Sequence, residues 1–252
     1  MAFGVDALVE LKTPAYFLSD VHLGEGSETE ERAKQLKFFA FLREVESQAK
    51  TLVFVGDVFD FWYEWQTVIP KEHFGLLCRL RRLCDARIAL HYLPGNHDFR
   101  LSGFLETELQ MVVHPDAAEF QVGEQRIYVG HGDGLLARDA GFRLFRRLLR
   151  NRLTQRLFSW LHPDLGMALA RTVSRRSRSK HRYRESDEAE YEAFAKAHLA
   201  RGFRGVIIGH SHHPRQVDFP NGTYVNLGDW IRHFSYGIHD GNRLALHHWQ
   251  GS

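Results

Sequence analysis

The chain has 252 residues, 44% hydrophobic and 25% charged, as is ordinary for a folded globular protein. No run of about 18 apolar residues occurs, and the first residues lack a basic segment followed by an apolar one. We therefore expect neither a membrane-spanning helix nor a secretory signal. Cys78 and Cys84 fit neither a CxxC pair nor a disulfide framework, which favours a reducing compartment.

The formal net charge of +2 conceals a strong asymmetry. Residues 138–184 contain thirteen Arg and one Lys against two acids, a balance of +12, so the remaining residues carry −10. A basic segment is therefore set into an acidic body, and it needs its own explanation.

Short apolar runs alternate with longer amphipathic stretches in the first half of the chain. The predicted strands are residues 15–18, 52–55 and 88–93, and the predicted helices between them are residues 28–50 and 71–84. This order predicts right-handed crossovers and a largely parallel central sheet covered on both faces. Runs at 111–113, 119–122 and 126–129 are short and close together, which predicts an antiparallel continuation.

Residues 138–200 carry almost no strand pattern. Apolar side chains recur at helical spacing from Phe142 to Leu149 and from Leu153 to Leu161, and residues 187–201 form a further predicted helix. Strand character returns at residues 205–208, 223–227, 236–238 and 244–248. We predict a single domain over residues 1–252, with a helical cap inserted at about residues 135–200.

Five short polar motifs lie at or just after the ends of predicted strands. They are Asp20-Val21-His22, Gly56-Asp57-Val58-Phe59-Asp60, Gly95-Asn96-His97-Asp98, Gly130-His131-Gly132-Asp133 and Gly209-His210-Ser211-His212. Each alone has an ordinary structural explanation, such as a helix cap for Asp57 or a turn around Asn96. Loops at the carboxyl ends of strands converge above the edge of an α/β sheet, so together the five motifs predict one shared crevice.

The side chains in these motifs suit two adjacent divalent cations. Carboxylate and imidazole donors favour Mn, Fe or Zn, whereas Mg favours oxygen ligands and water. Two metals about 3.5–4 Å apart need a bridging carboxylate, terminal ligands and a water whose pKa they lower. Residues i and i+2 of an extended segment point to the same side, so we expect Asp20 to converge with His22 and His210 with His212. The glycines that precede four of the motif residues are expected to permit tight turns.

In this order the five motifs resemble the signature of the calcineurin-like metallophosphoesterases, over roughly residues 15–240. The resemblance implies an α/β fold, an αββα sandwich with a two-metal site at the edge of the sheets. One ion would be held by Asp20, His22, Asp57 and His212, and the other by Asp57, Asn96, His131 and His210, with Asp57 bridging. His97, oriented by Asp98, would face the phosphoryl oxygens and the leaving group. Mn is the expected metal, with Fe or Zn as alternatives.

The substrate must be identified from the basic insertion. It interleaves apolar side chains between Phe142 and Leu161 with arginines between Arg143 and Arg156. An amphipathic basic helix of this kind suits an anionic membrane surface or an amphiphilic anion. Two alternatives remain open. The apolar stripe could pack on the core with the arginines in solvent, or the arginines could contact nucleic-acid phosphates.

Four further motifs are similar to those of the UDP-2,3-diacylglucosamine diphosphatases. They occupy residues 60–65 (DFWYEW), 131–134 (HGDG), 161–166 (LHPDLG) and 226–230 (NLGDW). This resemblance implies that an amphiphilic nucleotide-sugar lipid, UDP-2,3-diacylglucosamine, is hydrolysed to UMP and 2,3-diacylglucosamine 1-phosphate in lipid A synthesis. It also implies a cytoplasmic enzyme bound peripherally to the inner membrane of a Gram-negative-type bacterium. Neither nucleic acid nor an obligate protein partner is expected.

The same resemblance implies that the cap holds the acyl chains. The expected substrate contacts are Asn96, His97, Asp139, Ser177, His181, Arg184 and His210. The best-known branch of the family has Arg in place of His97, Asn in place of His181 and Lys in place of Arg184. A metallophosphoesterase that acts on another nucleotide or on nucleic acid is the first alternative. A non-catalytic scaffold is the second, and it is disfavoured because all seven expected ligands are present.

Overall fold

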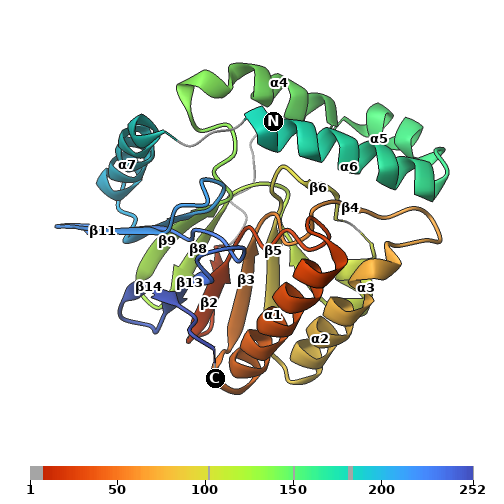
Figure 1. Ribbon diagram of the computed structural model, residues 1–252. Helices are drawn as coiled ribbons and strands as arrows, with labels where there is room; N and C mark the ends of the chain where they lie inside the picture. The colour runs from red at the N-terminus through yellow and green to blue at the C-terminus, as the bar shows by residue number, and fades with distance from the viewer. Residues whose placement is uncertain (1–7, 102, 150, 181–183, 252) are drawn as a thin grey trace, which may run out of the picture.

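The computed structural model describes residues 8–101, 103–149, 151–180 and 184–251. Two six-stranded sheets lie face to face, with helices on both outer faces (Figure 1). This is the αββα sandwich that the family resemblance implies.

The first sheet has a parallel centre and an antiparallel edge. Its strands, in spatial order, are β14 (Leu244–His248), β13 (Ser235–His239), β2 (Ala15–Leu18), β3 (Thr51–Val55), β5 (Ala89–Leu93) and β7 (Val112–Val113). The strands from β2 to β7 are parallel, and β13 is antiparallel to both of its neighbours.

The second sheet mixes both kinds of pairing. In spatial order it contains β1 (Val9–Glu10), β8 (Ala118–Val122), β9 (Gln125–Gly130), β10 (Gly205–Ile208), β12 (Gly222–Asn226) and β11 (Arg215–Phe219). β10 is parallel to β9 and β12, whereas β8–β9 and β11–β12 are antiparallel pairs. A separate parallel pair joins β4 (Trp62–Tyr63) to β6 (Asp98–Arg100).

Alternation along the strands divides the apolar side chains between three layers of core. Phe17 and Val53 of the first sheet meet Ile207 of the second sheet between the two sheets. Neighbouring residues point outward, so Leu18 packs under the helices on the first sheet and Ile208 under the helix on the second. Both sheets are thereby packed on both faces, and this packing holds the carboxyl ends of their strands in fixed positions relative to each other.

The helices on the outer faces are α1 (Glu28–Gln48), η1 (Lys71–His73), α2 (Phe74–Asp85) and α3 (Phe104–Leu109) on the first sheet, and α7 (Glu185–Ala200) on the second. A capping box begins α1, because the Ser27 hydroxyl accepts from the Glu30 N–H and the Glu30 carboxylate accepts from the Ser27 N–H. None of the helices in the described residues combines the length and apolar character needed to cross a membrane.

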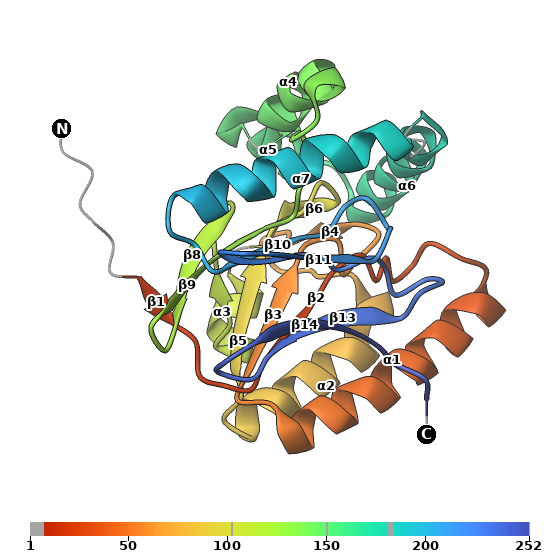
Figure 2. The ribbon, with the colours of Figure 1, turned by 90° about the vertical axis from the view of Figure 1, so that its left-hand side faces the viewer.

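A further group of helices lies above one end of the sheets (Figures 1 and 2). It consists of η2 (Ala137–Asp139), α4 (Ala140–Leu149), α5 (Arg152–Ser159) and α6 (Pro163–Lys180), which we call the cap. Helical periodicity predicts α4 and α5 well, whereas α6 was not separately predicted.

The first sheet is covered on both faces as expected, by helices on one face and by the second sheet on the other. One expectation about strand pairing is wrong. β7 pairs in parallel with β5, while β8 and β9 belong to the other sheet. Apolar periodicity identifies a strand but not its partner, and short or half-exposed strands such as β1, β4, β6 and β11 carry too few apolar residues to be identified.

Candidate metal centre

The five polar motifs meet at one edge of the two sheets. β2 is followed by Asp20 and His22, β3 by Asp57, β5 by Asn96, β9 by His131, and β10 by His210 and His212. The first three strands belong to one sheet and the last two to the other. The site therefore lies where the carboxyl ends of both sheets come together.

Most of these residues adopt a conformation that an extended segment does not have. The φ angles of Asp20, His22, Asp57, His210 and His212 are 54°, 46°, 54°, 66° and 58°. This left-handed region is costly for a residue with a side chain and is concentrated at functional sites. Asp20 and His22 converge as expected, but His210 and His212 contribute to two separate groups.

Close approach of neighbouring loops requires glycine at two positions. A Cβ atom at Gly95 would collide with the carboxylate of Asp57. A Cβ atom at Gly209 would collide with the side chains of Ser19 and Asp20. These glycines therefore leave space for buried carboxylates, apart from the greater conformational freedom that glycine gives the backbone.

The first group of potential ligands consists of Asp20, His22 and His212. The Nε2 atoms of His22 and His212 lie 3.5 Å and 3.3 Å from Asp20 Oδ1. Asp20 and His22 are buried, and all three ligand atoms lie within 4.8 Å of one another. This spacing allows one cation to be reached by all three side chains.

The second group consists of Asp57, His131 and His210. Asp57 Oδ2 lies 3.3 Å from His131 Nε2 and also 3.8 Å from His22 Nε2 of the first group. The amide oxygen of Asn96 lies 3.2 Å from His131 Nε2. The Asp57 carboxylate therefore faces both groups, which is the position a bridging ligand requires.

The electrostatics of the site favour added positive charge. Asp20 Oδ1 and both ring nitrogens of His22 are buried without a hydrogen-bond partner in the described part of the chain. Burial opposes protonation of the other rings, yet Asp57 and Asp20 raise the pKa of His131 well above its usual value, and Asp20 raises the pKa of His212 to about 9. In the absence of metal, protons on His131 and His212 balance the negative charge of the buried carboxylates. Divalent cations would balance the same charge when bound, so these residues fit a metal centre.

Asp229 holds one of the candidate histidine ligands, a role that nothing in the sequence indicated. Its Oδ1 accepts from the backbone N–H groups of Ile231, Arg232 and His233, at 3.0, 2.7 and 3.1 Å. Its Oδ2 lies 3.6 Å from His212 Nδ1. Burial opposes ionisation of Asp229, but these contacts lower its pKa far below the usual value, so the carboxylate stays charged and orients the ring.

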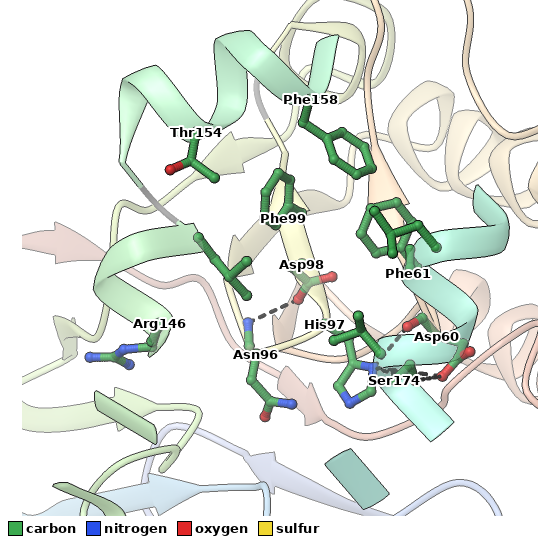
Figure 3. Close-up of a pocket in the computed structure, with 15 residues that line it drawn as sticks. Asp60, Phe61, Asn96, His97, Asp98, Phe99, Arg146, Thr154, Phe158 and Ser174 are labelled. Atoms are coloured by element: carbon green, nitrogen blue, oxygen red, sulfur yellow. Dashed lines mark hydrogen bonds and ion pairs between the residues drawn. The ribbon is translucent and has the colours of Figure 1, made fainter. Parts of the chain in front are cut away.

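His97 is fixed from one side and faces Asp57 with the other. Its Nδ1 lies 2.8 Å from the carbonyl oxygen of Asp60 and 3.3 Å from the hydroxyl of Ser174 on α6 (Figure 3). The same hydroxyl donates to Asp60 Oδ1 at 2.9 Å. Nε2 of His97 lies 4.0 Å from Asp57 Oδ2. Nothing in the sequence indicated that Asp60 and Ser174 are partners of this ring.

The expectation that Asp98 orients His97 needs correction. The Asp98 carboxylate accepts from the backbone N–H groups of Asp57 and Gly95, both at 2.9 Å, and from the Tyr92 hydroxyl at 2.9 Å. It therefore ties together the two loops that carry Asp57 and Asn96. The geometry of Asp98 positions candidate metal ligands, and the orientation of His97 comes from Asp60 and Ser174.

An apolar pocket of about 290 Å³ opens beside this centre. Phe61, Phe99 and Phe158 gather at one end of it, and Asn96 and His97 lie at the other (Figure 3). The remaining apolar lining comes from the cap, through Leu149 of α4 and Leu169, Ala170 and Val173 of α6. The pocket is thus formed between the cap and the motif loops, with its polar end at the candidate metal ligands.

Two of the other expected substrate contacts, Asp139 and Arg184, lie outside this pocket. Asp139 is buried in η2, and Arg184 is exposed at the start of α7, where its backbone N–H donates to Asp187. Neither lines the apolar pocket. Ser177 lies on α6, and nothing is described of its side chain; His181 lies outside the described residues.

Comparison with known proteins agrees with this geometry. Residues 13–214 match a family described as calcineurin-like phosphoesterase. A protein of Porphyromonas gingivalis named UDP-2,3-diacylglucosamine hydrolase is 30% identical, over 94% of this chain and 97% of its own. Proteins of the same name from Ralstonia nicotianae and Neisseria meningitidis are 30% and 29% identical, covering 88% and 86% of this chain and 85% and 90% of theirs.

Proposed function

Because the chain belongs to the calcineurin-like phosphoesterase family, we propose that this metal-dependent hydrolase cleaves the pyrophosphate of UDP-2,3-diacylglucosamine. The products are UMP and 2,3-diacylglucosamine 1-phosphate. The observation that carries the proposal is the apolar pocket, which begins at Asn96 and His97 beside two ligand groups that the Asp57 carboxylate faces. A substrate with a phosphate next to long acyl chains matches that combination, and the names of the similar proteins support the choice.

The two ligand groups would hold the two ions. Asp20, His22, Asp57 and His212 serve one ion, and Asp57, Asn96, His131 and His210 serve the other. Mixed nitrogen and oxygen donors favour Mn, with Fe or Zn as alternatives. When bound, such a pair neutralises phosphoryl charge and increases the acidity of water for attack on phosphorus. Asp98 keeps the two loops in register, through its contacts with Asp57 and Gly95.

His97 acts on the charge that develops at the phosphoryl group and the leaving oxygen. Its Nδ1 donates to the Asp60 carbonyl, which turns Nε2 toward the centre, where it would contact the phosphoryl or leaving oxygen. The ring loses little freedom during the reaction, because Ser174 and Asp60 already hold it. A donor fixed in this way stabilises the transition state more than the ground state.

The cap binds the lipid half of the substrate. We infer that it is an insertion at about residues 135–200 in a single domain. Acyl chains lie against Phe61, Phe99 and Phe158, and Asn96, His97 and His210 contact the phosphate. Asp139, Ser177, His181 and Arg184 are the further contacts that the family resemblance implies.

The outer surface of the cap supports peripheral association with the cytoplasmic face of an inner membrane. Large apolar side chains are exposed there, among them Trp160 at 75%, Leu144 at 69% and Leu165 at 65%. Exposed arginines such as Arg147 and Arg152 lie on the same helices. Apolar side chains with adjacent cations favour an anionic lipid surface, which is where a diacylated substrate resides.

The proposal is tested by measuring UMP release from UDP-2,3-diacylglucosamine in detergent, with Mn-loaded protein, beside hydrolysis of bis(p-nitrophenyl) phosphate. We expect UMP from the glycolipid, and none from Asp57→Ala, which lacks the shared carboxylate. Asp85→Asn, at an exposed carboxylate on α2, serves as the control. Cleavage of nucleic acid without cleavage of the glycolipid would contradict the proposed substrate and leave only the metal-dependent hydrolase.

A further inference from the structure

A second cavity, of about 560 Å³, shares Asp60 with the apolar pocket but has a different chemistry. The loop after β2, the turn η1 and the cap helix α6 meet there. Its lining includes Glu25, Glu28, Glu31, Glu72, His73 and Arg171. The concentration of carboxylates repels a phosphate, so a ligand of this cavity must present hydrogen-bond donors or positive charge.

One buried side chain in this acidic cavity has an unmet hydrogen-bonding atom. His73 is only 2% exposed, and its Nε2 has no hydrogen-bond partner in the described residues. Burial lowers the pKa of His73 to about 4, so the ring is neutral near pH 7. The ring is also hydrogen-bonded to the backbone of Phe61. Its Nε2 therefore offers a buried lone pair that calls for a donor.

A carboxylate oxygen lies beside this lone pair. Glu72 Oε1 is 3.7 Å from His73 Nε2. The other oxygen of Glu72 accepts from the Arg171 guanidinium, which fixes the carboxylate and joins the cap to η1. Two acceptors side by side match two neighbouring hydroxyl donors, and the cis-diol of a ribose has that arrangement. Carboxylates recognise ribose hydroxyls in the same manner in dinucleotide-binding folds.

The acidic cavity is also near enough to the metal centre to receive part of the same substrate. Asp60, which lines both cavities, has its Oδ1 4.0 Å from His22 Nδ1 and 3.6 Å from His97 Nδ1. The proposed substrate has a lipid half and a nucleoside half on either side of the bond that breaks. One cavity is apolar and the other is rich in acceptors, and both border the same residue.

We propose that the acidic cavity binds the ribose of the substrate's uridine, with its 2′- and 3′-hydroxyls donating to His73 Nε2 and Glu72 Oε1. The phosphates of the substrate remain at the metal centre, away from the carboxylates that line the acidic cavity. This inference rests on the proposed function for the identity of the nucleoside. The ribose site itself rests on the cavity, the unpartnered His73 nitrogen and the position of Glu72.

The test is a comparison of UMP with 2′-deoxy-UMP as inhibitors of the Mn-loaded enzyme. Loss of one hydrogen bond is expected to weaken inhibition of the native protein about tenfold. His73→Phe should reduce this preference towards one, because it removes the acceptor of the 2′-hydroxyl. Glu72→Gln, which weakens the acceptor of the 3′-hydroxyl, should weaken inhibition by both nucleotides alike. Phenylalanine suits position 73, because the centroid of the His73 ring lies 4.7 Å from that of Phe59 and 6.0 Å from that of Trp62, so the ring already packs among aromatic side chains. Glu46→Gln, at an acid on the surface of α1 that pairs with Arg82, is the matched control and should keep the preference.

Equal inhibition of the native protein by the two nucleotides would overturn the inference. A third Mn ion per chain that His73→Phe removes would also overturn it, because the acceptor pair would then be a cation site. Hydrolysis of the glycolipid without a ribose preference would defeat this inference and leave the proposed function intact. A ribose preference without glycolipid hydrolysis would defeat the proposed function and leave the ribose site.

Discussion

Truncation of Phe158 tests whether the cap holds acyl chains. Phe158 lies on α5 and lines the apolar pocket. Its ring centroid is 4.8 Å from that of Tyr63, 5.1 Å from that of Phe99 and 5.9 Å from that of Phe61. The side chain is half-buried, so part of its surface packs on the body of the protein and part faces the pocket.

The expected effect of Phe158→Ala follows from that division. A fully buried Phe→Ala change costs about 3–5 kcal/mol of stability, so a half-buried ring should cost about 2 kcal/mol. On the pocket side, two or three methylene groups of an acyl chain lose their contact, at about 0.8 kcal/mol each. That loss of about 2 kcal/mol corresponds to a decrease of about 30-fold in kcat/KM for the diacylated substrate.

The assay compares kcat/KM for the detergent-solubilised glycolipid with kcat/KM for bis(p-nitrophenyl) phosphate, below the unfolding temperature of the variant. The second value should change little, because that substrate has no acyl chain. Leu157→Ala is the matched control on α5, since Leu157 is 52% exposed and does not line the pocket. An equal decrease for both substrates would show that the ring is only part of the core, and no decrease for either would remove the pocket from the function.

His97→Ala is expected to lower kcat by about 10²–10³, the usual loss for one preorganised charge-stabilising group, and an unchanged kcat would exclude the ring from the site. Mn binding should release protons, because nearby carboxylates overcome burial to hold the pKa of His131 well above its usual value and that of His212 at about 9. Identical binding heats in buffers of different ionisation enthalpy would contradict this. His91 and His114 together should lower the free energy of unfolding of the metal-free protein by up to about 3 kcal/mol as pH falls from 6.5 to 4, since burial lowers the pKa of His91 to about 4 and also lowers that of His114. The unfolded chain then binds protons that the folded chain excludes. The measurement is a denaturant titration of the native protein and of the double variant His91→Leu/His114→Leu at both pH values. If the double variant lost as much stability as the native protein, other groups would be responsible for the decrease.

Strand positions, and the polar motifs that follow the strands, were predictable because they depend on local patterns. Buried strands such as β2 and β10 are continuous apolar runs, and their predicted bounds agree with the structure. The partners of those strands were not predictable from periodicity, so the separate sheet of β8 and β9 was missed. The left-handed conformations of Asp20, His22, His210 and His212 also leave no local signal, so the alternation of an extended segment does not describe the backbone there.

Residues that orient the site were harder to identify, because they come from distant parts of the chain. Ser174 reaches Asp60 across a separation of 114 residues, and only the packing of α6 over the loop after β3 brings them together. Serine is frequent in helices and loops, so nothing in its sequence context indicates this contact. Asp98 shows the opposite difficulty. Its motif was recognised, but its carboxylate accepts from the backbone of Asp57 and Gly95 and not from the adjacent His97.

The charge asymmetry of the chain is explained in part by how the cap joins the body. Arg146 on α4 pairs with Asp133 at 2.9 Å, and Arg171 on α6 pairs with Glu72. Arg143 donates to the carbonyl oxygens of residues 134 and 136, in the loop below α4. Basic residues of the cap therefore hold it over the acidic body, above the two cavities that meet at Asp60. Those arginines are committed to internal contacts, so the charge available to an anionic lipid surface is smaller than the balance of +12 in the sequence indicates.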